Sequence, residues 1–319
     1  IFLELTADGE LLECGQLPKL TTLPCKSEIV TVPFRTPKLK PAAECWLTVR
    51  FKLSQDTLWA ERGHEVGCTQ FKMPFEAPPS PVLKAEDMPV LKLDESSTKI
   101  TVSSPDFSLA FDKKEGRITS LRYKGSELVR RGPVLNVWRA PTDNDAPRQA
   151  PRWRGAGLDR IKYKTKNVKV ESVSPQVVRI NVESSASAPD VTEGFDCQYV
   201  YNVYSSGDIV VQTDIIPMGD LSTLPRIGLQ LIITGDFNTF TWYGRGPHES
   251  YCDRKEGALF ALYNGTVEDQ YVQYIMPQEN GNKTDVRWVS LTNSKGLGLL
   301  AVGMPLMEVS AHHYTTEDL

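Results

Sequence analysis

The chain has 319 residues, of which 40% are hydrophobic and 24% charged, and its formal net charge is −4 at pH 7. These values are ordinary for a globular protein with room for two domains, or for one large domain and a smaller one. Acidic and basic residues are interspersed, so no basic face for nucleic acid is predicted, and no apolar run approaches the length of about 18 residues that a membrane-spanning helix requires.

The N-terminal part of the chain predicts a compact β-domain over residues 1–75. Asp8-Gly9 lies between two short β-prone runs, and this dipeptide is a strong signal for a two-residue hairpin turn. Further strands are expected at residues 28–34, 45–53 and 66–73, which carry β-branched and aromatic residues between turn signals. This strand spacing is typical of an immunoglobulin-like sandwich.

Residues 76–95 separate this domain from the rest of the chain. Three prolines fall within residues 76–81, a composition that predicts an extended linker. Residues 96–319 then hold many short β-prone runs and one weak helix candidate, residues 254–262. This pattern predicts a large antiparallel β-supersandwich, so the fold class of the chain is all-β. Strands are expected at residues 99–102, 107–111, 118–123, 167–173, 177–184, 197–204, 209–216, 227–233, 237–242, 288–292 and 297–303.

The run of residues 138–145 is the most distinctive part of the second domain. Asp and Asn side chains hydrogen-bond to the nearby backbone and disfavour regular structure, so we expect an ordered polar loop, and such loops often carry function. A plain Asx-rich turn bridged by an arginine is the alternative. The candidate site residues in this loop are Trp138, Arg139, Asp143, Asn144 and Asp145.

A second polar loop follows a predicted strand, at residues 242–251. Its glycines allow close backbone approach, and its aromatic rings stand beside proton-transfer groups. That mixture suits a sugar, because a pyranose has one apolar face and a rim of hydroxyl groups. A packed β-corner, in which the histidine only donates to a carbonyl, is the alternative. The candidates in this loop are Tyr243, Arg245, His248 and Glu249.

A third polar loop occupies residues 277–282. Its amide, carboxylate and glycine residues can flex and can offer bidentate hydrogen bonds to neighbouring hydroxyl groups. The dipeptide Asn280-Gly281 could equally be a plain hairpin turn. The candidates in this loop are Gln278, Glu279, Asn280 and Gly281.

Several familiar patterns are missing from the sequence. It has no dinucleotide-binding, P-loop, zinc-protease or serine-hydrolase motif. Glycoside hydrolysis usually needs two facing carboxylates, and only Glu249 with Glu279 can be offered. His312-His313 is not expected to share a metal, because neighbouring strand residues point to opposite faces. The six cysteines form no CxxC pair and no signal-peptide pattern opens the chain, which predicts reduced thiols and a cytoplasmic location.

The three loops together resemble the large β-galactosidases of glycoside hydrolase family two. Residues 138–145 match the WRAPTDND signature of that family, residues 243–251 its YGRGPxExY element, and residues 274–281 its YxxPxENG element. Residues 59–66 are similar to the WxxxGHxV stretch that closes the immunoglobulin-like domain before the last domain. The motifs occur in the order of the family, and the resemblance covers nearly the whole chain.

The resemblance implies that the chain corresponds to the last two domains of a retaining β-galactosidase, which hydrolyses terminal β-D-galactosides such as lactose. The family's TIM barrel, with both catalytic glutamates and the main metal ligands, lies outside this sequence. No catalytic or metal-binding residue is therefore assigned, and Mg and Na are expected only for the intact enzyme. Both domains are expected to be incomplete at the ends of the chain.

The resemblance also implies roles for the three loops. Residues 278–281 would form a mobile loop that closes over the sugar, while residues 138–145 and 245–251 would support the wall of the active site. Arg139 and Arg245 are expected to bridge carboxylates bidentately. The expected partners are the TIM-barrel portion of the enzyme, the galactoside substrate and further copies in a homo-oligomer, with no nucleic acid and no membrane. The fragment alone is expected to be inactive.

Two other functions stay open on the residues alone. A non-catalytic carbohydrate-binding or assembly module would expose aromatic residues on a sheet face, whereas Trp138, Trp242 and Tyr243 are expected at loop edges. A stand-alone aldose mutarotase-like enzyme would have no need of the N-terminal domain, and it requires a histidine acid and a glutamate base. The pairs on offer combine His248, His312 or His313 with Glu249 or Glu279.

Overall fold

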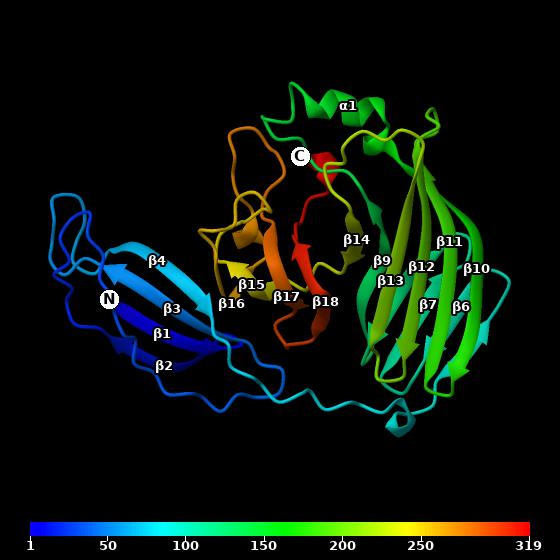
Figure 1. Ribbon diagram of the computed structural model, residues 1–319. Helices are drawn as coiled ribbons and strands as arrows, with labels where there is room; N and C mark the ends of the chain where they lie inside the picture. The colour runs from blue at the N-terminus through cyan, green and yellow to red at the C-terminus, as the bar shows by residue number, and fades with distance from the viewer.

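The computed structural model describes residues 1–319, and nearly all of its regular secondary structure is β-strand, arranged in four antiparallel sheets (Figure 1). The predicted all-β fold class is confirmed. No helix in the structure has both the length and the apolar character needed to cross a membrane. A small N-terminal sheet lies at one side of a larger body that holds the other three (Figure 1).

The N-terminal sheet has the strand order β2-β1-β3-β4. Asp8 and Gly9 take left-handed φ angles of 48° and 83° and close the β1–β2 hairpin, as the sequence predicts. Alternate residues of β1 are buried, so Leu3 and Leu5 face the core of this domain. The strands are β1 (Phe2–Ala7), β2 (Glu10–Gln16), β3 (Cys45–Lys52) and β4 (Glu65–Lys72).

The strand predicted at residues 28–34 is wrong, because residues 17–44 contain no strand. Prolines at positions 24, 33, 37 and 41 remove backbone donors that a ladder would require. The segment still covers the sheet: Leu17 and Leu39 belong to the domain core, and Val32 and Phe34 pack against it. An extended segment without strand pairing therefore covers the β1–β4 sheet, in place of a second regular sheet.

Between β4 and the next strand the chain is extended, apart from one turn of 3-10 helix, η1 (Ala85–Asp87). It runs from the N-terminal sheet along one side of the larger body to the far pair of sheets (Figure 1).

Two sheets of the larger body pack face to face around the main core (Figure 1). That core joins 25 buried residues, including Ile100 and Phe111 from one sheet and Ile180 and Tyr201 from the other. The six-stranded sheet contains β5 (Lys92–Glu95), β6 (Lys99–Ser103), β7 (Phe107–Asp112), β8 (Arg117–Tyr123), β9 (Ser126–Asn136) and β14 (Gly228–Ile233). The four-stranded sheet contains β10 (Lys162–Ser174), β11 (Val177–Ser187), β12 (Gly194–Tyr204) and β13 (Ile209–Met218).

The last sheet lies between the N-terminal domain and this pair, in the order β16-β15-β17-β18 (Figure 1). It has a core of its own, centred on Phe240, Trp242 and Val286. Its strands are β15 (Thr239–Gly246), β16 (Leu259–Thr266), β17 (Lys283–Thr292) and β18 (Gly298–Val309). Two of the three polar loops predicted from the sequence leave or enter this sheet. The prediction of a loop at residues 242–251 is wrong for its first half, because Trp242–Gly246 continue β15 and pair with β16.

The helix candidate at residues 254–262 is wrong, because its second half lies in β16, which pairs along its whole length with β15. The one α-helix, α1 (Gln149–Gly155), is missed because Pro151 suggests a break. That proline stands in the first turn, where its missing N–H has no intrahelical partner in any case. Two further short 3-10 turns, η2 (Leu158–Arg160) and η3 (Glu268–Gln270), occur in loops, and η4 (Thr316–Asp318) ends the chain.

Candidate functional site

The three polar loops predicted from the sequence meet in one cluster. The loop of residues 277–282 lies in the middle, and its Glu279 N–H donates to the Ala140 carbonyl over 3.2 Å. On its other side, the Gly281 N–H donates to Glu249 Oε2 over 2.8 Å. The central loop also uses a side chain for its contact with the first loop, because Gln278 Oε1 accepts from the Asp143 N–H over 3.1 Å. The central loop thus joins the other two.

The central loop is buried and internally bonded. Gln278 and Glu279 are each 7% exposed and Asn280 is 1% exposed. Asn280 Oδ1 accepts from the Val272 N–H over 3.0 Å, and its Nδ2 donates to the Gln278 carbonyl over 2.9 Å. Gly281 has a left-handed φ of 76°, and a Cβ there would lie 2.7 Å from a backbone carbonyl oxygen, so no other residue fits.

Glu249 is the acceptor that fixes the second loop to the central one. It is 6% exposed, and its carboxylate accepts from Arg254 Nη2 over 2.5 Å, from the Tyr274 hydroxyl and from Gly281 N–H. Burial by itself would raise the pKa of Glu249, but the hydrogen bonds from Tyr274, Gly281 and Arg254 outweigh burial and hold that pKa below its ordinary value. Glu249 is therefore an ionised structural acceptor at neutral pH, and not a proton donor.

Glu279 is also paired with an arginine. Its carboxylate forms an ion pair with Arg226, which belongs to the segment between β13 and β14. Both candidate carboxylates of the cluster are thus engaged by guanidinium groups. Nothing in the sequence around Arg226 forms a motif, so sequence reasoning had no signal by which to find it.

Arg139 pairs with Asp145 within the first loop, but not through the expected bidentate fork. A single nitrogen, Arg139 Nη2, reaches both oxygens of Asp145, at 3.0 and 2.8 Å. The same guanidinium lies 5.5 Å from the ring centre of Trp153 in α1, and Trp138 meets that ring edge-on. Asp143 and Asn144 are exposed at the tip of this loop.

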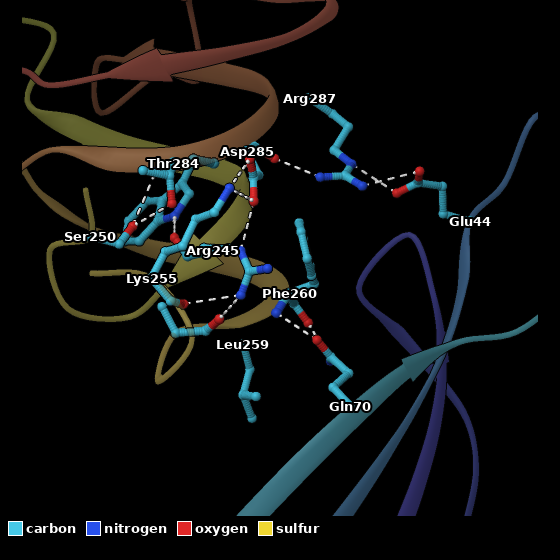
Figure 2. Close-up of polar contacts among 12 residues, drawn as sticks. Glu44, Gln70, Arg245, Ser250, Lys255, Leu259, Phe260, Thr284, Asp285 and Arg287 are labelled. Atoms are coloured by element: carbon cyan, nitrogen blue, oxygen red, sulfur yellow. Dashed lines mark hydrogen bonds and ion pairs between the residues drawn. The ribbon is translucent and has the colours of Figure 1, made fainter. Parts of the chain in front are cut away.

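Arg245 anchors the second loop differently from the expected bidentate pairing. Its Nε donates to Asp285 Oδ2 over 2.7 Å, while its Nη1 donates to the carbonyls of Lys255 and Ala258, each over 3.0 Å (Figure 2). Lys255 Nζ reaches the same carboxylate over 3.1 Å. Together the two cations hold the pKa of Asp285 below its ordinary value, although burial opposes them.

Asp285 marks a bulge in β17. Its φ is 52°, unusual for a residue with a side chain, and the register of β17 against β18 shifts on either side of Val286. Residues before the bulge hold the loops, because Thr284 Oγ1 hydrogen-bonds Ser250 Oγ over 2.8 Å (Figure 2). After it, Arg287 reaches the N-terminal domain, while Val286 and Val289 are buried in the core of the last sheet.

The junction with the N-terminal domain is built on Arg287. Its Nε and Nη2 donate to the two oxygens of Glu44 over 2.8 and 3.1 Å (Figure 2). The rings of Trp46 and Phe260 stack below with centroids 4.3 Å apart. Tyr243 is 3% exposed beside this junction, its ring centre lies 5.9 Å from the Arg287 guanidinium carbon, and burial raises its pKa.

His248, like Tyr243 and Asn144, is a predicted residue that the structure does not bring into the hydrogen-bonded cluster. It is exposed and borders an open depression of about 570 Å³. The charged and polar side chains Glu249, Asp253, Arg254, Lys255 and Tyr274 also line this depression. The structure contains no group of three or more His, Cys, Asp or Glu side chains arranged to hold a metal ion.

Two further residues of the cluster were missed or misread at the sequence level. Lys283 is 1% exposed, with its Nζ 5.0 Å from the ring centre of Trp242, and burial lowers its pKa to about 8 against the raising influence of Glu249. His312 Nε2 lies 3.0 Å from the Asn280 carbonyl oxygen. His313, considered with it as a pair, contacts Asn238 instead. Lys283 directly follows a polar loop, and nothing in the local sequence indicates that this charged residue is buried.

Comparison with known proteins gives matches along both parts of the chain. The family profile described as β-galactosidase small chain matches residues 103–319, and the profile described as β-galactosidase, domain 4, matches residues 1–74. Among curated proteins, a β-galactosidase of Priestia megaterium is 38% identical over 279 residues, covering 86% of this chain and 26% of the relative.

Two other relatives give similar coverage. A β-galactosidase of Halalkalibacterium halodurans is 30% identical over 88% of this chain and 28% of its own length. A β-galactosidase of Kluyveromyces lactis is 31% identical over 78% of this chain and 24% of its own length. The chain therefore spans about a quarter of the length of the curated relatives that it matches.

Proposed function

The chain belongs to the β-galactosidase family, and from this premise we propose that it lines and supports the active site of a retaining β-galactosidase whose catalytic barrel is a separate portion. The relatives carry the name β-galactosidase, which supports terminal β-D-galactosides such as lactose as substrates. The barrel portion, the galactoside and further copies in a homo-oligomer are the partners in this proposal. The six free cysteines support the reducing environment of the cytoplasm.

The observation that carries the proposal is the convergence of the three loops on residues 278–281. Six residues from other segments form hydrogen bonds or ion pairs with this stretch, so the loop is positioned within the chain itself. They are Ala140, Asp143, Arg226, Glu249, Val272 and His312. A wall that is already formed can present fixed backbone and side-chain groups to a sugar without reorganising, which favours binding of a transition state.

The same geometry supports inactivity of the chain alone. Retaining hydrolysis uses two carboxyl groups about 5–5.5 Å apart, one of which must carry a proton. Glu249 and Glu279 are each paired with an arginine, and the low pKa of Glu249 keeps it ionised. In the proposal, the acid and the nucleophile come from the barrel portion. Its Mg and Na ions would also be held there, and no step assigned to this chain uses a metal.

Hydrolysis of o-nitrophenyl β-D-galactoside tests the proposal. The chain is assayed alone and mixed with the Priestia megaterium β-galactosidase from which the matched region has been deleted. The matched region of that relative, added in trans, is the positive control. Activity only on mixing is expected. Activity of the chain alone would contradict the assignment of chemistry to the barrel. Restoration by the control region but not by this chain would contradict the supporting role.

A further inference from the structure

His312 reaches back to the central loop from beyond the last strand. It follows β18 by three positions, and its Nε2 lies 3.0 Å from the Asn280 carbonyl oxygen. A carbonyl oxygen only accepts, so Nε2 carries the proton and donates. The contact joins the chain's C-terminal segment to the backbone of the loop through one defined hydrogen bond.

Packing around His312 leaves this loop backbone little freedom. A Cβ on Gly281 would lie 2.9 Å from His312 Cε1 and 2.7 Å from the Gln270 carbonyl oxygen. The imidazole and that carbonyl therefore both crowd the glycine on the side where a Cβ would project. Tyr271 meets the imidazole edge-on, with centroids 6.5 Å apart, and fixes the ring from the side. His312 thus contributes both a donor and a rigid surface.

The charged groups around the imidazole of His312 act in opposite directions on its protonation. Glu279 attracts a proton to the imidazole, while Arg226 and Lys283 repel one, and burial is the largest influence. Burial lowers the pKa of His312 below its ordinary value, so the neutral ring predominates at pH 7. In the neutral ring with its proton on Nε2, Nδ1 is an acceptor, and this atom is buried without a partner in the chain.

We propose that His312 is a positioning residue for the central loop, residues 277–282: its Nε2–H fixes the Asn280 carbonyl and its ring packs against Gly281. The role of the loop toward galactoside rests on the proposed function above. The anchoring itself does not, and it is measurable on this chain alone. The donor, His312, lies outside the three predicted loops, so the position of the central loop depends in part on a segment outside all three motifs.

Hydrogen exchange on the complete chain provides the first test. Variant H312A removes the imidazole. Variant H312F keeps an aromatic ring without the donor, and H312Q keeps a neutral donor without the ring. H313A is the matched control, because His313 is exposed and contacts Asn238 outside the loop. Peptides covering residues 277–283 are expected to exchange at least tenfold faster in H312A and H312F, with a smaller change in H312Q and none in H313A. Equal exchange in H312F and the unmodified chain would overturn the proposal, and H312F keeps the test valid if H312A does not fold.

Kinetics of the reconstituted enzyme provide the second test. With the barrel portion added, H312F is expected to lower kcat at least fivefold, with KM changed less, and H312Q to recover most of the loss. An unchanged kcat in a variant with a loosened loop would overturn the positioning role while leaving the proposed function intact. No activity with the unmodified chain would count against the proposed function, and the exchange measurement would still decide whether His312 anchors the loop.

Discussion

Gln70 of the N-terminal domain pairs with the backbone of Phe260 in the last sheet. Its side-chain Nε2 donates to the Phe260 carbonyl over 2.9 Å, and its Oε1 accepts from the Phe260 N–H over 2.7 Å (Figure 2). Phe260 lies on β16, the edge strand of its sheet. The amide of one side chain therefore completes, at this position, the hydrogen bonding that a further strand would supply.

Gln70→Ala is expected to lower the free energy of unfolding by about 1–2 kcal/mol, because the Phe260 N–H and C=O lose their partners at a partly buried position. Chemical denaturation followed by tryptophan fluorescence measures the change. Gln16→Ala is the matched control, since Gln16 lies exposed on β2. An equal effect of both substitutions would contradict the edge-pairing role of Gln70.

Lys283→Met is expected to stabilise the chain at neutral pH. The folded state lowers the pKa of Lys283 from 10.5 to about 8, so the folded protein disfavours the charged form. The penalty is complete below pH 8 and disappears as the pH rises through 10.5, and it amounts to about 3 kcal/mol. Lost attraction to the Trp242 ring offsets about 1–2 kcal/mol of the gain.

Thermal unfolding of the Lys283→Met variant at pH 7 and pH 10 is the measurement. The advantage of the variant should shrink at the higher pH. Lys164→Met, at an exposed position, serves as the control and is expected to stay within about 0.5 kcal/mol of the unmodified chain. A destabilised Lys283→Met variant at pH 7 would show that the charge is better satisfied than its burial indicates.

Glu249→Gln is expected to weaken the link between the second and central loops. The carboxylate has a pKa below its ordinary 4.5, so its stabilising contribution is present above that pH and is lost as the pH falls through the folded-state pKa. The variant should lose about 1–3 kcal/mol at pH 7 through its weaker hydrogen bonds. Below pH 4 the difference from the unmodified chain should narrow, which denaturation curves across pH would show.

Gly281→Ala and Gly296→Ala separate backbone strain from crowding. Both glycines have a positive φ, 76° and 74°, but only a Cβ on Gly281 meets other atoms. Gly296→Ala should cost about 1–2 kcal/mol from the left-handed backbone alone. Gly281→Ala should cost about 3 kcal/mol or more, because the Gln270 carbonyl must also move. Similar unfolding free energies for the two variants would show that the loop yields easily.

Acid sensitivity should depend in part on His312. Its folded-state pKa lies below 6.5, so the unfolded chain binds the proton first as the pH falls. The free energy of unfolding therefore falls as the pH drops below about 6.5, and at higher pH it does not depend on the protonation of His312. His312→Gln should remove that portion of the loss between pH 7 and pH 5, while His313→Gln should not. Melting temperatures measured at both pH values provide the comparison.

The parts of the fold that the sequence predicts are those governed by local rules. Asp8-Gly9 specifies its hairpin because both residues tolerate a left-handed φ. Residues 28–34 alternate like a strand, yet prolines near them leave no complete ladder, so the segment packs without pairing. Pro151 indicates a break in a helix, but it does not disrupt α1 because it lies in the first turn.

In the candidate site, too, the residues within sequence motifs can be predicted, whereas their partners from other segments cannot. Motif residues such as Arg139, Arg245 and Glu249 are identified because they lie in polar loops between β-prone runs, and the pairing of the two arginines with carboxylates is expected only from the resemblance to the family. The partners that come from elsewhere, Arg226 and His312, carry no local signal. They reach Glu279 and Asn280 only through the arrangement of sheets, which is a property of the whole chain. Burial of the central loop depends on that arrangement as well.

The bulge at Asp285 makes β17 sensitive to length as well as to composition. Thr284, before the bulge, bonds the second loop, and Arg287, after it, reaches Glu44 in the other domain. Side chains alternate along a strand, so deletion of one residue between them would turn Arg287 to the opposite face while every remaining residue stayed the same. Tolerance to insertion or deletion should therefore be lowest at this short stretch, where the spacing of two attachments is set by a single extra residue.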